Sequence, residues 1–245
     1  MFFKQPTQVF SVEGNIGTGK STFLEKLKTH FKSNSKICFL DEPINVWNSI
    51  TDKKGVTILE KYYGNQEKYA FSFQMMAFIS RLTSLRTTLT KGYDIIIMER
   101  SLQTDCNVFA KMLYDDKKIE DIEYSIYQKW FNDFMQELPI ISFIYLKTDP
   151  IISCRRVLNR NRQGEIIPLS YLKNCDKYHN EWLLGENKID LLVLDANVDI
   201  NDNPEIVDEW ISKIEWFIRK NKKMNEWMGI IDYAYFIQNK LFGGV

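Results

Sequence analysis

A glycine-rich stretch near the start of the chain has the residue types and spacing of a phosphate-binding loop. It matches the pattern G-x-x-x-x-G-K-[ST] and follows an apolar run. In such a loop the backbone N–H groups surround phosphate oxygens, the lysine reaches the β- and γ-phosphates, and the final hydroxyl can bind Mg²⁺. We therefore predict a nucleoside triphosphate site, with an ordinary glycine-rich turn as the alternative. The predicted nucleotide-binding residues are Gly14, Asn15, Ile16, Gly17, Thr18, Gly19, Lys20, Ser21 and Thr22.

Carboxylates follow two later apolar runs. Glu42 comes after the run 37–40, and Pro43 prevents that strand from continuing. A carboxylate at this place could accept the proton of a hydroxyl that attacks the γ-phosphate. Glu99 and Arg100 follow the next run, and there the carboxylate could hold Mg²⁺ while the guanidinium binds phosphoryl oxygens. The alternatives are a solvated acid at Glu42 and a surface ion pair at Glu99 and Arg100.

A long segment with helical periodicity combines groups that could recognise a nucleobase. It predicts a helix over residues 63–86, which has no Pro and no Gly after its second residue. Gln74 and Arg81 are seven residues apart, so two helical turns place them on one face with Phe78 between them. An amide, a ring and a guanidinium in a row suit the edge of a base.

Two residues after the Glu-Arg-Ser segment could complete this surface. Asp105 and Phe109 are spaced i and i+4, so they could supply a carboxylate for Arg81 and a second ring for stacking. An aromatic stripe on a helix is more often part of a core than of a base pocket, and that alternative stays open.

Four of the eight arginines lie close together after the fourth apolar run, at Arg155, Arg156, Arg160 and Arg162. Guanidinium groups stabilise the charge of a transferring phosphoryl group, and the Gln-Gly sequence that follows could let this segment close as a lid. The alternative is a solvated basic helix.

The elements that must position these side chains follow from five short apolar runs. These runs are rich in β-branched and aromatic residues, and helix-like segments separate them. They predict an α/β domain with a five-stranded parallel sheet and helices on both faces. In such a sheet ligands bind at the carboxyl ends of the strands, where the motifs above lie. The runs are residues 9–12, 37–40, 95–98, 140–146 and 191–194.

Composition narrows the possible partners. The chain has 245 residues, and its 32 basic and 32 acidic side chains leave no net charge to attract a nucleic acid polymer or an anionic membrane. No apolar run reaches the roughly 20 residues that cross a bilayer. The four cysteines are far apart and lack the spacing of a zinc site or a disulfide framework. We expect a cytoplasmic protein with reduced thiols.

Taken together, these motifs resemble the deoxynucleoside kinase family over residues 8 to about 217. The resemblance implies a P-loop kinase fold with a lid segment, a kinase domain over residues 1–219, ATP as the phosphate donor, Mg²⁺ as cofactor, and a homodimer. Residues 220–245 form a C-terminal extension that we expect to be helical. The segments that carry the resemblance are EGNIGTGKST (13–22), EPINVW (42–47), FSFQ (71–74), ERS (99–101), RNR (160–162), IPLSYL (167–172) and HNEWL (179–183).

The resemblance also implies roles for single residues. Glu42 is the general base, and Ser21 and Glu99 hold the metal. The other catalytic residues are Lys20, Arg100, Arg160 and Arg162, and the last two close on the phosphates. Asp199 belongs to a segment similar to the family's adenine-binding loop. The implied nucleoside-binding residues are Glu42, Trp47, Tyr63, Phe73, Gln74, Arg81, Arg100, Asp105, Phe109 and Glu165.

The implied reaction is transfer of the γ-phosphate of ATP to the 5′-hydroxyl of a deoxynucleoside. Family members that select thymidine tend to lack the Arg and Asp found here at Arg81 and Asp105, so we expect purine deoxynucleosides or deoxycytidine to be favoured over thymidine. Two alternatives remain. A deoxynucleoside monophosphate kinase would use a similar lid, although a carboxylate base would repel its phosphorylated acceptor. A non-catalytic nucleotide-binding switch module would leave Gln74 and Arg81 without a small substrate.

Overall fold

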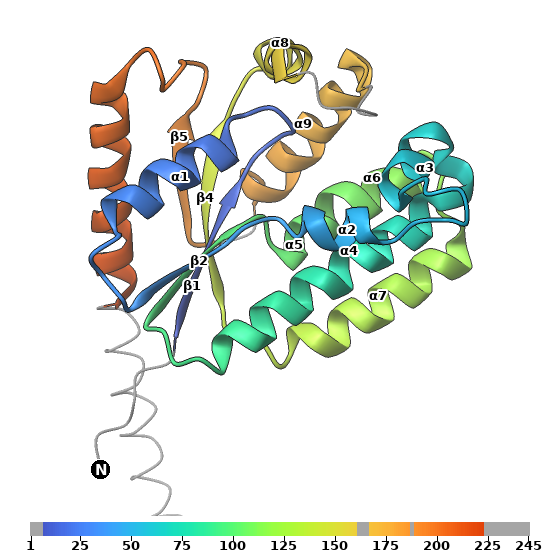
Figure 1. Ribbon diagram of the computed structural model, residues 1–245, viewed down its shortest axis with the longest axis horizontal. Coiled ribbons are helices and arrows are strands. Elements are labelled where there is room, and N and C mark those ends of the chain that lie inside the picture. The colour runs from blue at the N-terminus through green and yellow to red at the C-terminus, as the bar shows by residue number, and fades with distance from the viewer. Residues whose placement is uncertain (1–6, 161–166, 187–188, 223–245) are drawn as a thin grey trace, which may run out of the picture.

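The chain folds around a central parallel sheet, as a computed structural model that describes residues 7–160, 167–186 and 189–222 shows (Figure 1). The five strands of the sheet are all parallel and lie in the order β2-β3-β1-β4-β5. Each predicted apolar run coincides with one strand, so the predicted α/β class and the five-stranded parallel sheet are confirmed. The strands are β1 (Gln8–Glu13), β2 (Ile37–Leu40), β3 (Ile95–Glu99), β4 (Ile141–Lys147) and β5 (Leu191–Asp195).

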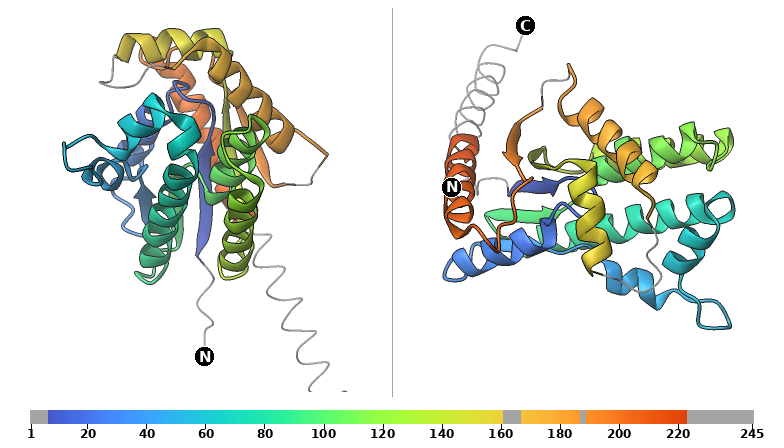
Figure 2. Two further views of the ribbon diagram at one scale, coloured as in Figure 1. Left: turned by 90° about the vertical axis from the view of Figure 1, so that its right-hand side faces the viewer. Right: turned by 90° about the horizontal axis from the view of Figure 1, so that it is seen from above.

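Helices cover both faces of the sheet (Figures 1 and 2). Successive strand residues point to opposite faces, so Val9 and Phe10 of β1 belong to different hydrophobic cores. On one face α1 (Lys20–His30) and the helical segment 204–222 pack on Phe10. On the other face α4 (Gln66–Leu89), α7 (Asp121–Met135) and α9 (Leu169–Leu183) pack on Val9.

Short helices connect these layers near the carboxyl ends of the strands. Residues 220–222 continue the last helical segment, and the remainder of the predicted C-terminal extension, 223–245, lies outside the described residues. In the part of the chain that the structure describes, no helix combines the length and apolar character needed to cross a bilayer. The short helices are α2 (Ile44–Ser49), α3 (Ile58–Gly64), α5 (Leu102–Thr104), the π-helical turn η1 (Asp105–Ala110), α6 (Lys111–Asp115) and α8 (Pro150–Arg160).

The helix predicted over residues 63–86 was wrong at its start. Asn65 has an extended backbone (φ −156°, ψ 86°), which separates α3 from α4. Its side chain accepts a hydrogen bond from the Lys68 N–H and so caps α4, which is a common use of asparagine. Tyr63 therefore belongs to α3 and reaches the site from a different helix than Gln74 does.

Candidate active site

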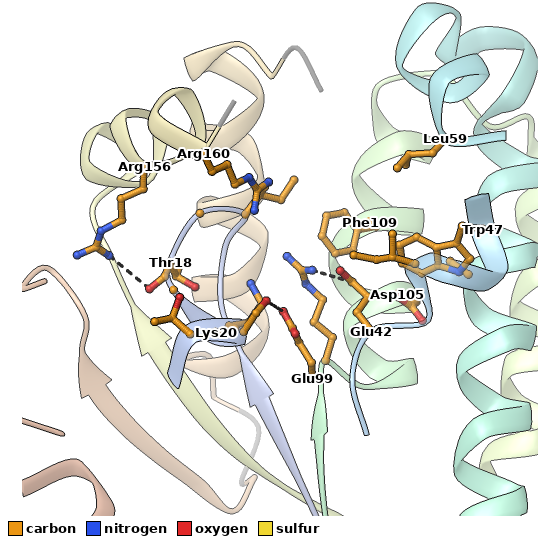
Figure 3. Close-up of a pocket in the computed structure, with 18 of the residues that line it drawn as sticks. Thr18, Lys20, Glu42, Trp47, Leu59, Glu99, Asp105, Phe109, Arg156 and Arg160 are labelled. Atoms are coloured by element: carbon orange, nitrogen blue, oxygen red, sulfur yellow. Dashed lines mark hydrogen bonds and ion pairs between the residues drawn. The ribbon is translucent and has the colours of Figure 1, made fainter. Parts of the chain in front are cut away.

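A cavity of about 380 Å³ opens at the carboxyl ends of the strands, where parallel sheets bind ligands. The phosphate loop, α8 and the segment 198–201 line one part of it, and α2, α3, α4 and η1 line the other. In Figure 3, Lys20, Arg156 and Arg160 lie on one side and Trp47 lies on the other, with Glu42 and Phe109 between them. A cavity of this size and mixed polarity is typical of small-molecule sites.

The phosphate loop has the backbone conformation that its glycines allow. Gly17 has φ +83°, and a Cβ atom there would lie 2.5 Å from the Ser153 carbonyl oxygen on α8. Lys20 begins α1, and its Nζ donates hydrogen bonds to the carbonyl oxygens of Gly14 (3.0 Å) and Asn15 (2.7 Å). Burial, and the positive charge of Arg100, lower the pKa of Lys20 to about 7, although nearby carboxylates act in the opposite direction.

The two predicted metal ligands lie together. Ser21 Oγ on α1 donates a hydrogen bond to Glu99 Oε1 at the end of β3 (2.9 Å), and both residues line the cavity. Mg²⁺ in phosphotransferases takes one or two protein oxygens and fills its other positions with phosphate oxygens and water. A hydroxyl and a carboxylate at the mouth of a phosphate loop fit this requirement.

Glu42 lies next to the phosphate loop, held by two guanidinium groups. Arg100 Nη1 donates to Glu42 Oε1 (2.8 Å), and Arg81 Nη2 approaches the same oxygen at 3.4 Å. Burial alone would raise the pKa of Glu42, but the charges of Arg100, Arg81 and Lys20 outweigh burial and lower it to about 2. The carboxylate is therefore ionised at neutral pH.

Arg81 and Asp105 form the ion pair expected from the sequence. Arg81 Nε donates to Asp105 Oδ2 at 2.9 Å, and Nη2 lies 3.4 Å from Oδ1. Arg81 Nη1 also donates to the Glu99 carbonyl oxygen (2.6 Å), which ties α4 to the end of β3. Burial alone would lower the pKa of Arg81, but the carboxylates of Asp105 and Glu42 raise it, so the guanidinium stays charged.

We predicted that Phe78 lies between Gln74 and Arg81 on the cavity wall, and this prediction is wrong. Gln74 and Arg81 are buried and line the cavity. Phe78 instead packs with Leu82 in the hydrophobic core that also contains Val9 of the sheet. Ala77 lies at the cavity instead. A small side chain, and not a ring, therefore lies at the cavity at this position.

Aromatic side chains form another part of the cavity wall. Trp47 meets Phe73 edge to face at 5.4 Å between centroids, and its Nε1 donates to Ser80 Oγ (2.9 Å). Phe109 lines the cavity and lies 5.2 Å from the Arg100 guanidinium. Tyr63 also lines it. The structure thus brings together all the predicted ring residues of the nucleoside pocket.

Arg156 is a lining residue that the sequence did not single out from the arginine cluster. Its guanidinium donates to the carbonyl oxygens of Val198 (2.7 Å) and Ala196 (2.9 Å), and approaches that of Thr18 at 3.3 Å. It therefore connects α8, the phosphate loop and the segment that contains Asp199, which also lines the cavity. The sequence showed the density of arginines but not which of them turns toward the loop.

Of the remaining predicted residues in and after the arginine segment, the structure describes only one. Arg160 ends α8 and lines the cavity. Arg162, Glu165 and the predicted lid lie outside the described residues.

A phosphate loop on a parallel sheet, with a paired carboxylate and arginine in the same cavity, defines the class of P-loop phosphotransferases. The family model described as "Deoxynucleoside kinase" matches residues 10–219. The chain belongs to the deoxynucleoside kinase family, and it is a kinase.

Curated relatives agree with this assignment and align over most of their length. A probable deoxycytidine kinase of fowlpox virus is 34% identical over 216 residues, which cover 85% of this chain and 87% of the relative. The deoxycytidine kinase of Homo sapiens is 31% identical over 238 residues, covering 83% and 89%. The mitochondrial deoxyguanosine kinase of Xenopus laevis is 28% identical over 237 residues, covering 85% and 88%.

Proposed function

We propose that this kinase transfers the γ-phosphate of ATP to the 5′-hydroxyl of a deoxynucleoside, with Glu42 as the general base. The observation that carries the proposal is the place of the Glu42 carboxylate. It lines the same cavity as the phosphate loop and as Trp47, Phe73 and Gln74. A hydroxyl bound there can face both a carboxylate and the γ-phosphate.

The low pKa of Glu42 suits phosphoryl transfer. A carboxylate with a pKa of about 2 is a weak base, but the transition state of phosphoryl transfer is loose and requires little proton removal before the new bond forms. Glu42 would first orient the hydroxyl and accept its proton late. Negative charge on bound ATP would also offset the fields of Lys20 and Arg100 and raise the pKa of Glu42 during turnover.

The donor half of the site would act by charge and position. Lys20, Arg160 and Arg162 would hold the phosphates, and Arg100 would approach the transferring group. Ser21 and Glu99 would hold Mg²⁺, which supplies positive charge on the β- and γ-phosphate oxygens. Asp199 and its neighbours would meet the adenine.

The acceptor half would select the nucleoside. Gln74 would hydrogen-bond the base between the rings of Trp47, Phe73 and Phe109, while Tyr63 and Glu165 would hold the 3′-hydroxyl. The ion pair of Arg81 and Asp105 supports a preference for purine deoxynucleosides or deoxycytidine over thymidine. The names of the relatives, deoxycytidine kinase and deoxyguanosine kinase, support the same preference.

The decisive experiment compares initial rates for the four deoxynucleosides and their monophosphates at fixed ATP and Mg²⁺, in the wild type and in Glu42→Gln. We expect deoxyadenosine, deoxyguanosine or deoxycytidine to react well above thymidine. We expect Glu42→Gln to lower kcat by about a hundredfold or more, since a general base contributes 10²–10⁴-fold.

Other outcomes have clear meanings. Reaction with monophosphates alone would make the protein a monophosphate kinase, and phosphate release to water alone would favour a switch module. A preference for thymidine would overturn the interpretation of Arg81 and Asp105.

We also propose that residues 1–219 form a kinase domain followed by a helical extension, that the protein is a homodimer, and that it is cytoplasmic. An exposed apolar stripe on α7 supports the homodimer, because Ile122, Ile126 and Trp130 follow one another at i, i+4 and i+8 and remain 42–66% exposed. Free thiols at all four cysteines fit a reducing compartment.

A further inference from the structure

A buried carboxylate lies directly behind the phosphate loop and outside the cavity. Glu13 is the last residue of β1, immediately before Gly14, and its side chain is fully buried. Residues such as Lys20 and Arg100 line the cavity, but Glu13 does not. A buried acid is costly unless hydrogen bonds satisfy it. Its partners therefore show what it does.

Three hydroxyl groups donate to Glu13. Ser11 Oγ (2.6 Å) and Ser101 Oγ (2.7 Å) donate to Oε1, and Thr104 Oγ1 donates to Oε2. Ser11 lies on the same strand as Glu13, whereas Ser101 and Thr104 begin and end α5 after β3. The carboxylate thus joins the end of β1 to the segment that follows β3.

The residue just before that segment has a conformation that needs support. Arg100 has φ +59°, in the left-handed region that side chains other than glycine rarely adopt. Such a conformation persists only when the surrounding structure holds it. The Arg100 N–H donates to the Val12 carbonyl oxygen (3.1 Å), and Arg81 holds the Glu99 carbonyl on the other side. Glu13 holds the next residue, Ser101.

This conformation sets where Arg100 points. Its guanidinium donates to Glu42 Oε1 (2.8 Å) and lies 3.5 Å from the Gly14 carbonyl oxygen. If residue 101 moves, the backbone of residue 100 can relax to a negative φ, and the side chain then leaves this direction.

We infer that Glu13 is a positioning residue of the kinase, which holds Arg100 in its left-handed conformation through Ser101 and Thr104 and so keeps the guanidinium at the reaction centre. The inference rests on the proposed role of Arg100 and deepens it. Glu13 does not line the cavity, so its effect on the reaction would pass through Arg100.

A carboxylate suits this position. The hydroxyls of Ser101 and Thr104 each accept the other residue's N–H in the cap of α5, at 3.2 Å and 3.4 Å, and their oxygens lie 3.1 Å apart. A carboxylate offers two acceptor oxygens and no donor, so both hydroxyls can donate to it. A glutamine would place an N–H₂ donor opposite one of them, and that hydroxyl would then turn its proton away from residue 13 toward the other hydroxyl.

The test is a double-mutant cycle with Glu13→Gln and Arg100→Ala, in which kcat, the KM of the deoxynucleoside and the KM of ATP are measured. We expect Glu13→Gln to lower kcat about tenfold to a hundredfold, as misplacement of a catalytic group by about 1 Å does, with smaller changes in both KM values. In the Arg100→Ala background, Glu13→Gln should change kcat less than twofold.

A control separates positioning from general destabilisation. Ser11→Ala removes one hydrogen bond to the same carboxylate but leaves the link between β1 and α5 intact. We expect it to lower the melting temperature as Glu13→Gln does while kcat stays within about twofold.

A second pair keeps the inference testable if Glu13→Gln does not fold. Thr104→Ser retains the hydroxyl and should keep wild-type kcat, whereas Thr104→Val removes it and should reproduce the loss. Three results would overturn the inference alone: equal kcat for both Thr104 variants, an unchanged kcat for Glu13→Gln beside an impaired Arg100→Ala, or additive losses in the double-mutant cycle.

An Arg100→Ala enzyme with normal activity would instead overturn the proposed role of Arg100, and the inference with it.

Discussion

Lys20 is the residue whose chemistry depends most on whether ATP is bound. In the structure its ammonium group is buried and paired only with backbone carbonyls and distant carboxylates, so its pKa is about 7. A bound triphosphate would bring several negative charges close to Nζ and raise this pKa. The same amine would therefore lose its proton more readily in the free enzyme than in the complex with ATP.

We expect ATP binding to become weaker as pH rises above about 7. Below this pH Lys20 is protonated in both states, and above it the free enzyme must take up a proton to bind ATP, so the affinity falls by up to about tenfold per pH unit. Calorimetric titration with a non-hydrolysable ATP analogue and Mg²⁺, in buffers of different ionisation enthalpy, measures this uptake directly. Lys20→Arg is the control, because a guanidinium stays charged throughout. Absence of proton uptake in the wild type at pH 8 would contradict the assigned pKa.

At the scale of elements, strands were more predictable than helix faces. The five apolar runs became five strands because a strand buried on both faces leaves little ambiguity in sequence. Helix α4 contributes Phe78 to the core on the sheet and Ala77 to the cavity, which the sequence cannot show. Ala77 and Phe78 lie about 50° to either side of the line from Gln74 to Arg81, at 100° per residue. Periodicity therefore could not decide which of them faces the ligand.

The site itself was predictable as a set of residue types and not as a network. Glu42, Arg81, Glu99 and Arg100 were all expected, but their mutual contacts join residues 18 to 58 positions apart and exist only after folding. The π-helical turn η1 also has no clear signal in sequence, although it carries Asp105 and Phe109. Asn65 was the one missed boundary with a recognisable signal, since asparagine favours the first capping position.

The contact between the phosphate loop and α8 gives a prediction at this scale. Gly17 and Gly19 both have positive φ, so alanine at either position costs roughly 1–2 kcal/mol in backbone strain. Only at Gly17 would the new Cβ atom also meet α8, because nothing lies within 4 Å of the Cβ position at Gly19. We expect Gly17→Ala to lower the free energy of unfolding of the ligand-free enzyme by about 1–3 kcal/mol more than Gly19→Ala, because overpacking against α8 costs about that much. Equal losses in urea denaturation would show that the approach of α8 is unimportant for the loop.

At the scale of the whole molecule, one of the helices that cover the sheet exposes a stripe of apolar side chains. Figure 1 shows α4 and α7 extending beyond the sheet on the side where α2 and α3 lie. The apolar stripe of Ile122, Ile126 and Trp130 runs along α7, where a soluble monomer would gain nothing from exposing it. Helix α7 packs on α4, which carries Gln74 and Arg81, so a dimer through this stripe would stiffen the cavity wall that α4 forms.

We expect Trp130→Glu to convert the proposed dimer to a monomer, because it places a charge in the centre of the apolar stripe, where it would be desolvated in an interface. Trp130 is 47% exposed in the single chain, so the substitution should lower the free energy of unfolding only slightly. Trp216→Glu is the matched control, since Trp216 is 59% exposed on the helical segment 204–222, which covers the opposite face of the sheet. Sedimentation velocity should show a monomer for Trp130→Glu and a dimer for the wild type and Trp216→Glu. A dimer in all three proteins would exclude the α7 stripe as the interface, and a dimer lost only in Trp216→Glu would place the interface on the other face.

If the stripe is the interface, the monomer should also bind the deoxynucleoside with a raised KM and an unchanged KM for ATP, because α7 supports α4 and not the phosphate loop.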